Sequence, residues 1–415
     1  MFFPLFIARR LRLKVKGDRG SATGMTVGII GVTTAVMIMM LAMSIVTGFK
    51  HDIKQKLQGL NSDITLYHSD SYISLSPALE SAIGDVVPGA SVSVVTDRTG
   101  ILKSPGQFQA VTFRGIDKDY DFSLISSSLV SGAADSLFKS AGYNDEGVDP
   151  IVMSAMVADM LGVGAGDRLT AYFVENENAR VRRYRIDGLY DTHFGDYDKM
   201  MVFVPKSSLS FDGLTLTGQQ GTSVLIDGVA EDEIAPASQS LYDRLVEASA
   251  DGKIDQLPMI DNILHSQGMY YNWLSLLDTN VVVILSLMGV VAAFTLVSSL
   301  FILILRRVRM IGILRSLGAS RHQVSQIFVI LSLRVVGYGI LIGTALGVLL
   351  LYAQHTWHVI ALDATSYYLD YVPVSIDWWQ ILALDGSVAV ISALVLLLPS
   401  RLVATISPAQ VMRYE

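Results

Sequence analysis

The stretch TNVVVILSLMGVVAAFTLVSSLFILILRRVRMIGILRSLGASRHQ, residues 279–323, contains the two features that decide the fold. Its first part, residues 279–305, has no charged side chain. It is long enough for a transmembrane helix, which needs about 20 apolar residues. Its second part, residues 306–323, is rich in arginine. An apolar run that leads into a basic loop is typical of a helix that crosses a membrane and emerges in the cytoplasm.

Three other stretches have the same apolar character. Residues 21–48 carry no charge, residues 321–353 are interrupted by Arg334, and residues 378–400 contain Asp385. The first run is much longer than the apolar core of a signal peptide, about 7–15 residues, and no A-x-A-like site follows it. The chain is 51% hydrophobic and 17% charged, whereas a typical soluble domain is about 25% charged. We therefore expect an α-helical membrane protein with four transmembrane helices.

Lysine and arginine set the orientation, because short loops rich in these residues stay in the cytoplasm. The N-terminal residues 1–20 and the loop 306–320 are strongly basic, and residues 401–415 also carry arginine. The loop 354–377, in contrast, has no lysine or arginine. We expect both termini in the cytoplasm of a multi-pass inner-membrane protein, with residues 49–275 forming a periplasmic domain inserted between the first and second helices.

Charge is distributed unevenly along the chain. Residues 49–275 hold 17 of the 31 basic residues and 31 of the 38 acidic residues, so the outer domain is acidic and the rest of the chain is basic. This arrangement fits an integral membrane protein that contacts lipid. It gives no support to nucleic-acid binding, which would need a basic face on a folded domain.

The outer segment has the pattern of a mixed α+β domain. Alternating residues predict strands over 63–67, 92–96, 108–114, 168–174, 180–189 and 200–204, and residues 151–153 lead into a helix that begins after Ser154. Helices are expected over 76–87, 154–162 and 232–248, with Ser76 and Ser154 as N-caps. Residues 175–178 are expected to form the turn of a hairpin.

Few residues suggest catalysis. The chain has no cysteine and no G-x-x-x-x-G-K-[ST] or H-E-x-x-H motif, so we expect no nucleotide, cofactor or metal bound by this chain and no enzymatic activity of its own. His355 with His358, and His193 with Asp196, have ligand-like spacings. We favour packing at the membrane interface for the first pair and a polar turn for the second.

The basic loop predicts a short amphipathic helix. Gly318 is suited to end it, and Ser320 with Gln323 forms the S-x-x-Q capping box of the next helix. The apolar face of the short helix is expected to consist of Met310, Ile313, Leu314 and Leu317. The pattern alone fits two roles equally: a helix lying on anionic lipid through its arginines, or a docking helix for a soluble partner.

The block LVSSLFILILRRVRMIGILRSLGASRHQVSQIFVIL, residues 296–331, resembles the permeases of the FtsX/MacB superfamily of ABC transporters. The order of one span, a large outer domain and three spans is similar too. IVMSAMVADMLGVGAGDRLTAYF and VRRYRIDGLYDTHFGDYDKMMVFVP look like the periplasmic core of that family. The segments FIARRLRLK, SIVTGFKHDIKQKLQGLNSDITLYH and ISPAQVMRYE resemble the lipoprotein-releasing LolC/LolE branch.

This resemblance implies a mechanism and partners. The loop after the second span would be the coupling helix that contacts a separate ATPase subunit, which would bind ATP and Mg. Its contact residues would be Met310, Ile311, Gly312, Ile313, Leu314, Arg315, Leu317, Gly318 and Ala319. The other implied partners are a second permease copy or a sister permease, membrane lipids, a lipoprotein substrate and a periplasmic carrier. The short hairpin at residues 175–180 is similar to the LolE type, which leaves carrier docking on this chain open.

Two other functions of the superfamily stay open. An FtsX-like scaffold would signal to an extracytoplasmic hydrolase without moving a substrate. A MacB-like permease would export a peptide or toxin.

Inside the spans, small residues predict close helix packing. Gly339, Gly343 and Gly347 recur every four residues, as do Gly24 and Gly28. The family also implies an acyl-chain cavity between the first two spans, for which the candidates are Met37, Met40, Met43 and Phe294. Ordinary packing is the alternative for these side chains. Arg334 and Asp385 lie at a similar depth and are expected either to form an ion pair, within the chain or between subunits, or to face water separately.

Overall fold

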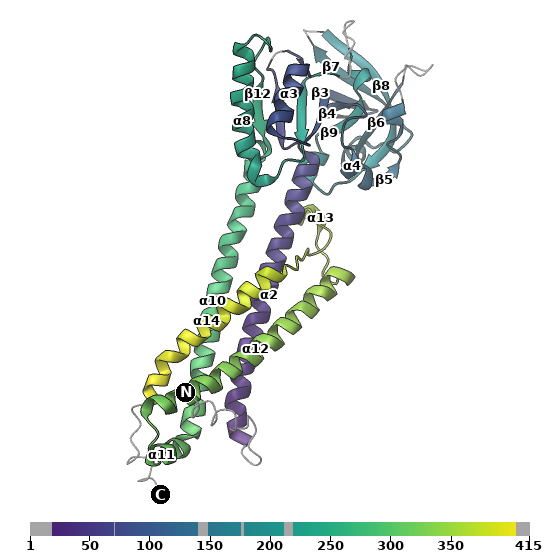
Figure 1. Cartoon of the computed structure of the whole chain (residues 1–415). Coiled ribbons are helices and arrows are strands. Elements are labelled where there is room, and N and C mark those ends of the chain that lie inside the picture. The colour runs from purple at the N-terminus through teal and green to yellow at the C-terminus, as the bar shows by residue number, and fades with distance from the viewer. Residues whose placement is uncertain (1–18, 70, 140–147, 176–177, 211–218, 404–415) are drawn as a thin grey trace. The chain divides into compact units, whose positions relative to one another are not determined.

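The computed structural model describes residues 19–403 except residues 70, 140–147, 176–177 and 211–218 (Figure 1). The described residues form two compact units. The helical unit contains the residues up to His51, Trp273–Ala361 and the residues from Tyr371 onward. The α/β unit contains Asp52–Asn272 together with Leu362–Asp370. The predictions for residues 1–18 and 404–415 lie outside the described residues.

The predicted four apolar helices are present. They are α2 (Arg19–Leu60), α10 (Gly268–Arg306), α12 (Arg321–Trp357) and α14 (Trp378–Val403), and the short α11 (Val308–Ser316) lies between α10 and α12. Each of the four long helices contains a segment long and apolar enough to cross a membrane. Helix α2 extends past residue 48, the predicted end of the first span. It continues because Ile53, Leu57 and Leu60 follow at helical spacing and are buried in the α/β unit.

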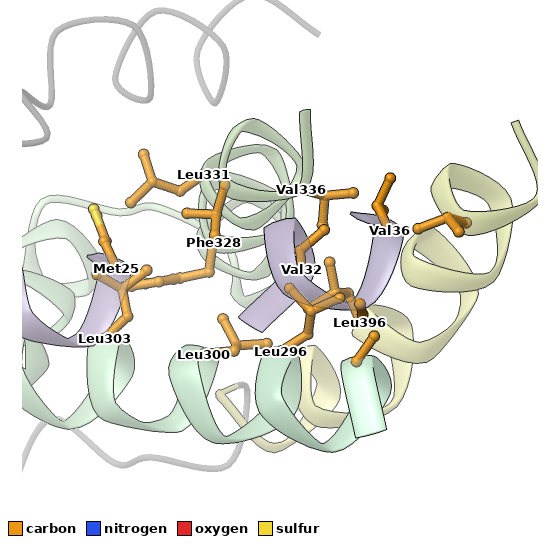
Figure 2. Packing of buried hydrophobic residues seen from close by; sticks show 14 of the residues in the cluster. Met25, Val32, Val36, Leu296, Leu300, Leu303, Phe328, Leu331, Val336 and Leu396 are labelled. Atoms are coloured by element: carbon orange, nitrogen blue, oxygen red, sulfur yellow. The ribbon is translucent and has the colours of Figure 1, made fainter. Parts of the chain in front are cut away.

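The core of the helical unit consists of interlocking aliphatic side chains from all four long helices (Figure 2). Val32 and Val36 of α2 lie among Leu296 and Leu300 of α10 and Val336 of α12. By contrast, much of α10 outside this core is exposed, as expected for a helix whose other side faces lipid or a second subunit.

Glycines of α12 form the predicted packing seam, and the seam lies within the chain. A Cβ atom at Gly343 would lie 2.8 Å from the backbone oxygen of Thr33, and one at Gly347 would lie 2.8 Å from Sδ of Met40. Thr33 also donates a hydrogen bond from Oγ1 to the carbonyl oxygen of Gly339, at 3.2 Å. Helices α2 and α12 therefore approach as closely as small-residue seams in membranes allow. The packing of Gly24 lies outside the side chains that the structure describes.

The α/β unit is built around a large sheet. Its main strands are β1 (Ile64–Tyr67), β3 (Ser91–Ser104), β4 (Gln107–Ile116), β5 (Leu129–Gly132), β6 (Asp149–Ser154), β7 (Arg168–Glu175), β8 (Asn178–Tyr190), β9 (Met201–Pro205), β11 (Ser223–Asp227) and β12 (Met259–Asn262), and β2 (Ile73–Ser74) pairs separately with β10 (Gln220–Gly221). Its helices are α3 (Pro77–Val86), α4 (Ser123–Ser127), α5 (Ser136–Lys139), α6 (Ala155–Leu161), α7 (Gly195–Asp198), α8 (Glu231–Ala250), α9 (Ile263–Ser266), α13 (Ala364–Tyr367) and the 3-10 turn η1 (Lys206–Leu209).

Strand pairing closes part of this sheet into a barrel. The strands pair in the cycle β3, β4, β9, β6, β8, β7 and back to β3. Strand β3 is long enough to pair with β11 through Ser91–Val95 and with β4 through Thr96–Ser104. It therefore joins the barrel to the open sheet β12-β1-β11-β3. The barrel interior is filled by apolar side chains such as Phe113, Phe173 and Tyr184.

Most local predictions for this unit are confirmed. Ser76 caps α3 by accepting a hydrogen bond from the Leu79 amide, and Ser154 caps α6 by accepting one from Val157. Gly162 ends α6 with a φ of 65°, which glycine adopts without strain. Glu175 pairs with Asn178, so β7 and β8 form the predicted hairpin. The prediction missed the short strands β2, β5, β6, β10, β11 and β12, whose brief runs give only a weak alternating signal.

Candidate functional site

The segment that links α10 to α12 is the candidate docking site. Gly318 has a φ of 94° and directs the chain away from α11, while the Ala319 amide donates to the Leu314 carbonyl oxygen at 3.0 Å. Ser320 accepts from the Gln323 amide at 3.2 Å, and the Gln323 side chain accepts from the Ser320 amide at 2.9 Å. The predicted helix stop and capping box are confirmed. Together they fix where α11 ends and α12 begins.

The apolar face of α11 differs from the predicted one. Ile311, which was not assigned to that face, is 1% exposed and belongs to the core of the helical unit. Ile313 and Leu317 are 54% and 79% exposed. Successive residues of an α-helix point about 100° apart, so Ile311 and the pair Ile313/Leu317 lie on different sides. Helix α11 is therefore anchored by one apolar side and presents another to its surroundings.

The other predicted coupling residues lie between these two sides. Met310 and Ala319 are partly buried against the core of the helical unit. Gly312, Leu314 and Arg315 are half-buried, and Gly318 is exposed. Residues 310–319 thus pack partly against the core of the helical unit, and Ile313 and Leu317 are the apolar side chains of this stretch that are exposed.

The predicted acyl-chain residues do not all face one cavity. Met40 is buried, packs against Gly347 of α12 and lines a small pocket together with Met43 and residues of α14. Met43 is partly buried in the same core, Met37 is half-buried, and Phe294 is 71% exposed on α10. A cavity of about 200 Å³ does lie between α2, α10 and α14. Its lining includes Met39, Gly289, Ala292, Leu384, Ser387 and Val388.

Asp385 has an uncharged hydrogen-bond partner within the chain. The hydroxyl of Thr344 hydrogen-bonds to both carboxylate oxygens of Asp385, at 3.0 and 2.8 Å. Arg334 precedes Thr344 on α12 by ten residues, or roughly 15 Å at 1.5 Å per residue, which is too far for its guanidinium to share that carboxylate. Pairing between subunits stays a prediction.

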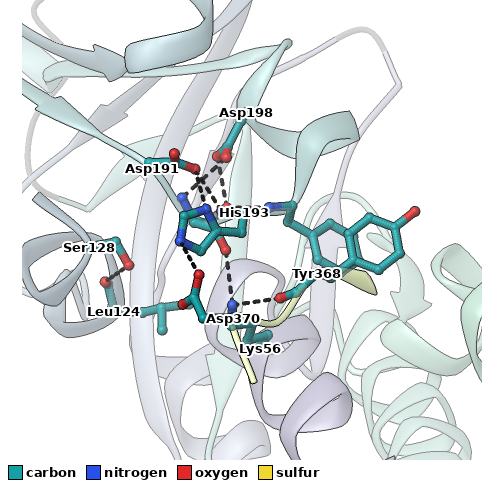
Figure 3. A network of polar contacts seen from close by, with 10 residues as sticks. Lys56, Leu124, Ser128, Asp191, His193, Asp198, Tyr368 and Asp370 are labelled. Carbon is teal, nitrogen blue, oxygen red and sulfur yellow. Dashed lines mark hydrogen bonds and ion pairs between the residues drawn. The ribbon is translucent and has the colours of Figure 1, made fainter. Parts of the chain in front are cut away.

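A cluster of polar side chains lies in the α/β unit where β8 leads into α7 (Figure 3). His193 lies 3.0 Å from Asp191 and 3.2 Å from Asp370, whereas Asp196 accepts a hydrogen bond from Tyr270 at 2.8 Å. His193 and Asp196 therefore have different partners, and the polar turn favoured for them is present. Among the residues that the structure describes, no group of three or more His, Asp or Glu side chains could hold a metal ion.

Asp198 is the buried carboxylate of this cluster. It is 1% exposed and accepts hydrogen bonds from the amide and hydroxyl of Thr192, at 3.1 and 2.8 Å. Burial raises the pKa of Asp198 to about 6, because the charged form loses more solvation than these bonds return.

The raised pKa of Asp198 predicts a pH-dependent stability. Its contribution favours the folded α/β unit below about pH 4 and is lost as the pH rises through about 6, at a cost of up to about 3 kcal/mol. Thermal unfolding of the full chain in detergent between pH 4 and 7 measures this effect. Asp198→Asn is expected to make the profile shallower, with the remaining slope due to Asp227, whose pKa burial also raises to about 6, whereas Asp251→Asn, at an exposed carboxylate, should leave the profile unchanged. An Asp198→Asn profile as steep as the wild type would contradict this assignment.

Three comparisons place the chain among known proteins. Residues 282–408 match the FtsX-like permease C-terminal family. The chain is 23% identical over 435 aligned residues to the lipoprotein-releasing system transmembrane protein LolC of Xylella fastidiosa, and the alignment covers 100% of both chains. It is 22% identical over 415 residues to LolE of Haemophilus influenzae, covering 92% of each chain. The solved extracellular domain of the ABC-type transporter YknZ covers 49% of this chain with 15% identity and a TM-score of 0.28, which is too low to support an argument.

The four apolar helices and the matched C-terminal segment support a multi-pass membrane permease. Together with the full-length similarity to LolC and LolE, this match supports an FtsX-superfamily permease of the LolC/LolE type.

Proposed function

We propose that this permease releases acylated lipoproteins from the inner membrane, using ATP hydrolysed by a separate subunit. The α/β unit, which follows the first span in the sequence, would lie on the periplasmic side, with both termini and α11 in the cytoplasm. The acidic composition of residues 49–275 and the basic loop 306–320 support this orientation. The full-length similarity to LolC and LolE supports the substrate class.

The exposed pair Ile313/Leu317 is the observation that supports the ATPase partner most directly. A helix lying on lipid would be expected to turn its apolar side to the membrane and its arginines to water. In α11 the inward side is already occupied by Ile311, and the outer apolar pair lies beside the exposed Arg309. An outward apolar pair on a well-anchored helix fits a groove on a protein partner. ATP and Mg would be bound by that partner, and a second copy or sister permease would complete the transporter.

Removal of acyl chains from the bilayer explains the need for ATP. Each buried CH₂ contributes about 0.8 kcal/mol to membrane anchoring, so a multiply acylated protein does not leave unaided at a useful rate. We place the acyl contact near Met37, Met43 and Phe294 and in the cavity beside Met39. Met40, which packs against Gly347 and lines a small pocket with Met43, belongs to the same proposed contact.

Reconstitution tests the proposal. The permease would be co-expressed with the ATP-hydrolysing subunit that co-purifies with it, and placed in proteoliposomes that contain an acylated lipoprotein. We expect ATP to transfer the lipoprotein to a soluble periplasmic carrier, and no transfer with a non-hydrolysable analogue. Two results would contradict lipoprotein release. One is ATP-dependent movement of a peptide or toxin but not of lipoprotein. The other is depletion that gives chained cells with no lipoprotein retained at the inner membrane.

A further inference from the structure

The connection between α12 and α14 contributes a segment to the α/β unit. Residues 362–370 are assigned to that unit, although the residues on both sides of them belong to the helical unit. We call this segment the α12–α14 loop tip. Its neck is closed by a hydrogen bond from the Leu362 amide to the Asp370 carbonyl oxygen, at 2.9 Å, and by a bridge between Ala361 and Tyr371. Leu369 is buried at 7% exposure, so the tip is packed as part of the unit.

Aromatic side chains hold the tip on one side. Tyr368 stacks on Phe194, with ring centroids 4.6 Å apart and planes inclined by 29°. Both rings also contact Tyr270, at centroid distances of 5.0 Å from Phe194 and 6.3 Å from Tyr368. Phe194 is only 3% exposed, so lifting the tip away would uncover an otherwise buried ring.

Lys56 joins the tip to the unit through backbone atoms. Its Nζ atom donates to the Tyr368 carbonyl oxygen at 2.8 Å and to the Thr192 carbonyl oxygen at 3.1 Å (Figure 3). Burial lowers the pKa of Lys56, against the opposing influence of the nearby carboxylates of Asp370, Asp198, Asp191 and Asp52. One side chain from α2 thus satisfies a carbonyl oxygen on each side of the contact.

His193 makes the second polar link. Its Nδ1 lies 3.0 Å from Oδ1 of Asp191, and its Nε2 lies 3.2 Å from Oδ1 of Asp370. An ionised carboxylate can only accept hydrogen bonds, so both ring nitrogens donate when the imidazole carries a positive charge. Asp191 belongs to the connection between β8 and α7, and Asp370 belongs to the loop tip. Without His193, the negative charges of Asp191 and Asp370 would repel each other across the contact.

We propose that His193 and Lys56 are positioning residues that keep the α12–α14 loop tip fastened to the α/β unit throughout the transport cycle. The fastening would pass movements of α12 and α14 to the α/β unit, in addition to the direct route through α2 and α10. The chain between α12 and the tip is short, residues 358–361, so it can absorb little displacement of the helix end. This inference rests on the proposed transport function for its role, but the fastening itself can be measured without transport.

Hydrogen exchange tests the fastening. Asp370→Asn is suited to this test because the Asp370 side chain is 62% exposed and its replacement leaves no cavity. We expect Asp370→Asn and His193→Gln each to speed amide exchange in residues 362–370 about tenfold, and the double variant to add little to either change, because both remove the same link. His265→Gln is the matched control: it removes another His–Asp contact of the unit, at 2.9 Å, away from the tip. Unchanged exchange in both single variants, or an equal rise in the control, would overturn the fastening.

A second experiment tests the role in transport. The chain has no native cysteine, so Asp191→Cys and Asp370→Cys, at side chains that are 38% and 62% exposed on the two sides of the contact, can be joined selectively with a short reducible bismaleimide. If the contact stays closed, the cross-linked transporter keeps its ATP-driven lipoprotein release. Asp370→Asn is expected to reduce release several-fold while the partner still hydrolyses ATP. Loss of release on cross-linking, restored by reductant, would overturn the closed contact, as would normal release from a variant with a loosened tip. If the wild type releases no lipoprotein, the proposed function fails, whereas the exchange result still decides the fastening.

Discussion

Replacement of Gly343 by Leu is expected to lower the stability of the helical unit by about 3 kcal/mol, near the upper end for an overpacked core. A Cβ at this position would lie 2.8 Å from the Thr33 carbonyl oxygen and 3.0 Å from Cβ of Val36. The first of these atoms is backbone of α2 and cannot rotate away, so α2 and α12 would have to separate. Separation would also weaken the hydrogen bond from Thr33 to Gly339. Thermal unfolding of the full chain in detergent would measure the loss.

Gly337 provides the matched control for this prediction. It lies on the same helix, and a Cβ there would meet nothing within 4 Å. Gly337→Leu should therefore leave the unfolding temperature close to that of the wild type, since the added side chain points into open space. Equal destabilisation by the two substitutions would mean that α12 tolerates no larger residue for reasons unrelated to the α2 seam.

The same seam shows which features the sequence could predict. Glycines four residues apart lie on one face of a helix by geometry alone, so Gly339, Gly343 and Gly347 indicate close packing without knowledge of the partner helix. The cap residues Ser76, Ser154 and Ser320 were predictable for the same reason, because a side chain that bonds to an amide three residues ahead acts locally. The four apolar runs follow from length and composition.

Features that depend on distant contacts could not be predicted in this way. Strand β3 pairs with three other strands along its length, and the alternation of residues 92–96 revealed only its first part. The loop tip at residues 362–370 contacts Lys56 and His193, which lie far away in the sequence. The partner of Asp385 is a similar case, because depth along a helix does not say which way a side chain turns. Thr344, a residue without charge, was therefore overlooked.

The candidate docking site has both kinds of feature: some depend on nearby residues and could be predicted, and others depend on distant contacts and could not. The stop at Gly318 and the capping box at Ser320 were local and are confirmed. The division of α11 into an inner and an outer apolar side was not predictable, because Ile311 is buried by the helical unit rather than by its own helix. That division determines which substitutions can test partner binding without disturbing the fold.

Changing Ile313 and Leu317 together to Asp is expected to abolish docking of the ATP-hydrolysing partner. Both side chains are more than half exposed, so the double variant should insert and fold normally. Apolar anchors at the centre of an interface commonly contribute about 2–4 kcal/mol, and loss of about 3 kcal/mol would weaken binding more than a hundredfold. Co-purification of the partner with the full-length permease, followed by its affinity in detergent, measures the effect, and ATP-driven release of lipoprotein should fall in parallel.

A control with the same chemistry separates docking from a general effect of added charge. Val359 and Ile360 are 68% and 55% exposed in the loop 354–377, which we place on the opposite side of the membrane from α11. Changing both to Asp adds the same two charges and should leave partner binding intact. Ile311→Ala addresses the inner side: it should cost about 2–4 kcal/mol of stability by leaving a cavity, and should weaken docking only through loss of the α11 anchor. If Ile313→Asp/Leu317→Asp still co-purifies with the partner while the Val359/Ile360 control does not, α11 is not the docking site and the proposed orientation is reversed.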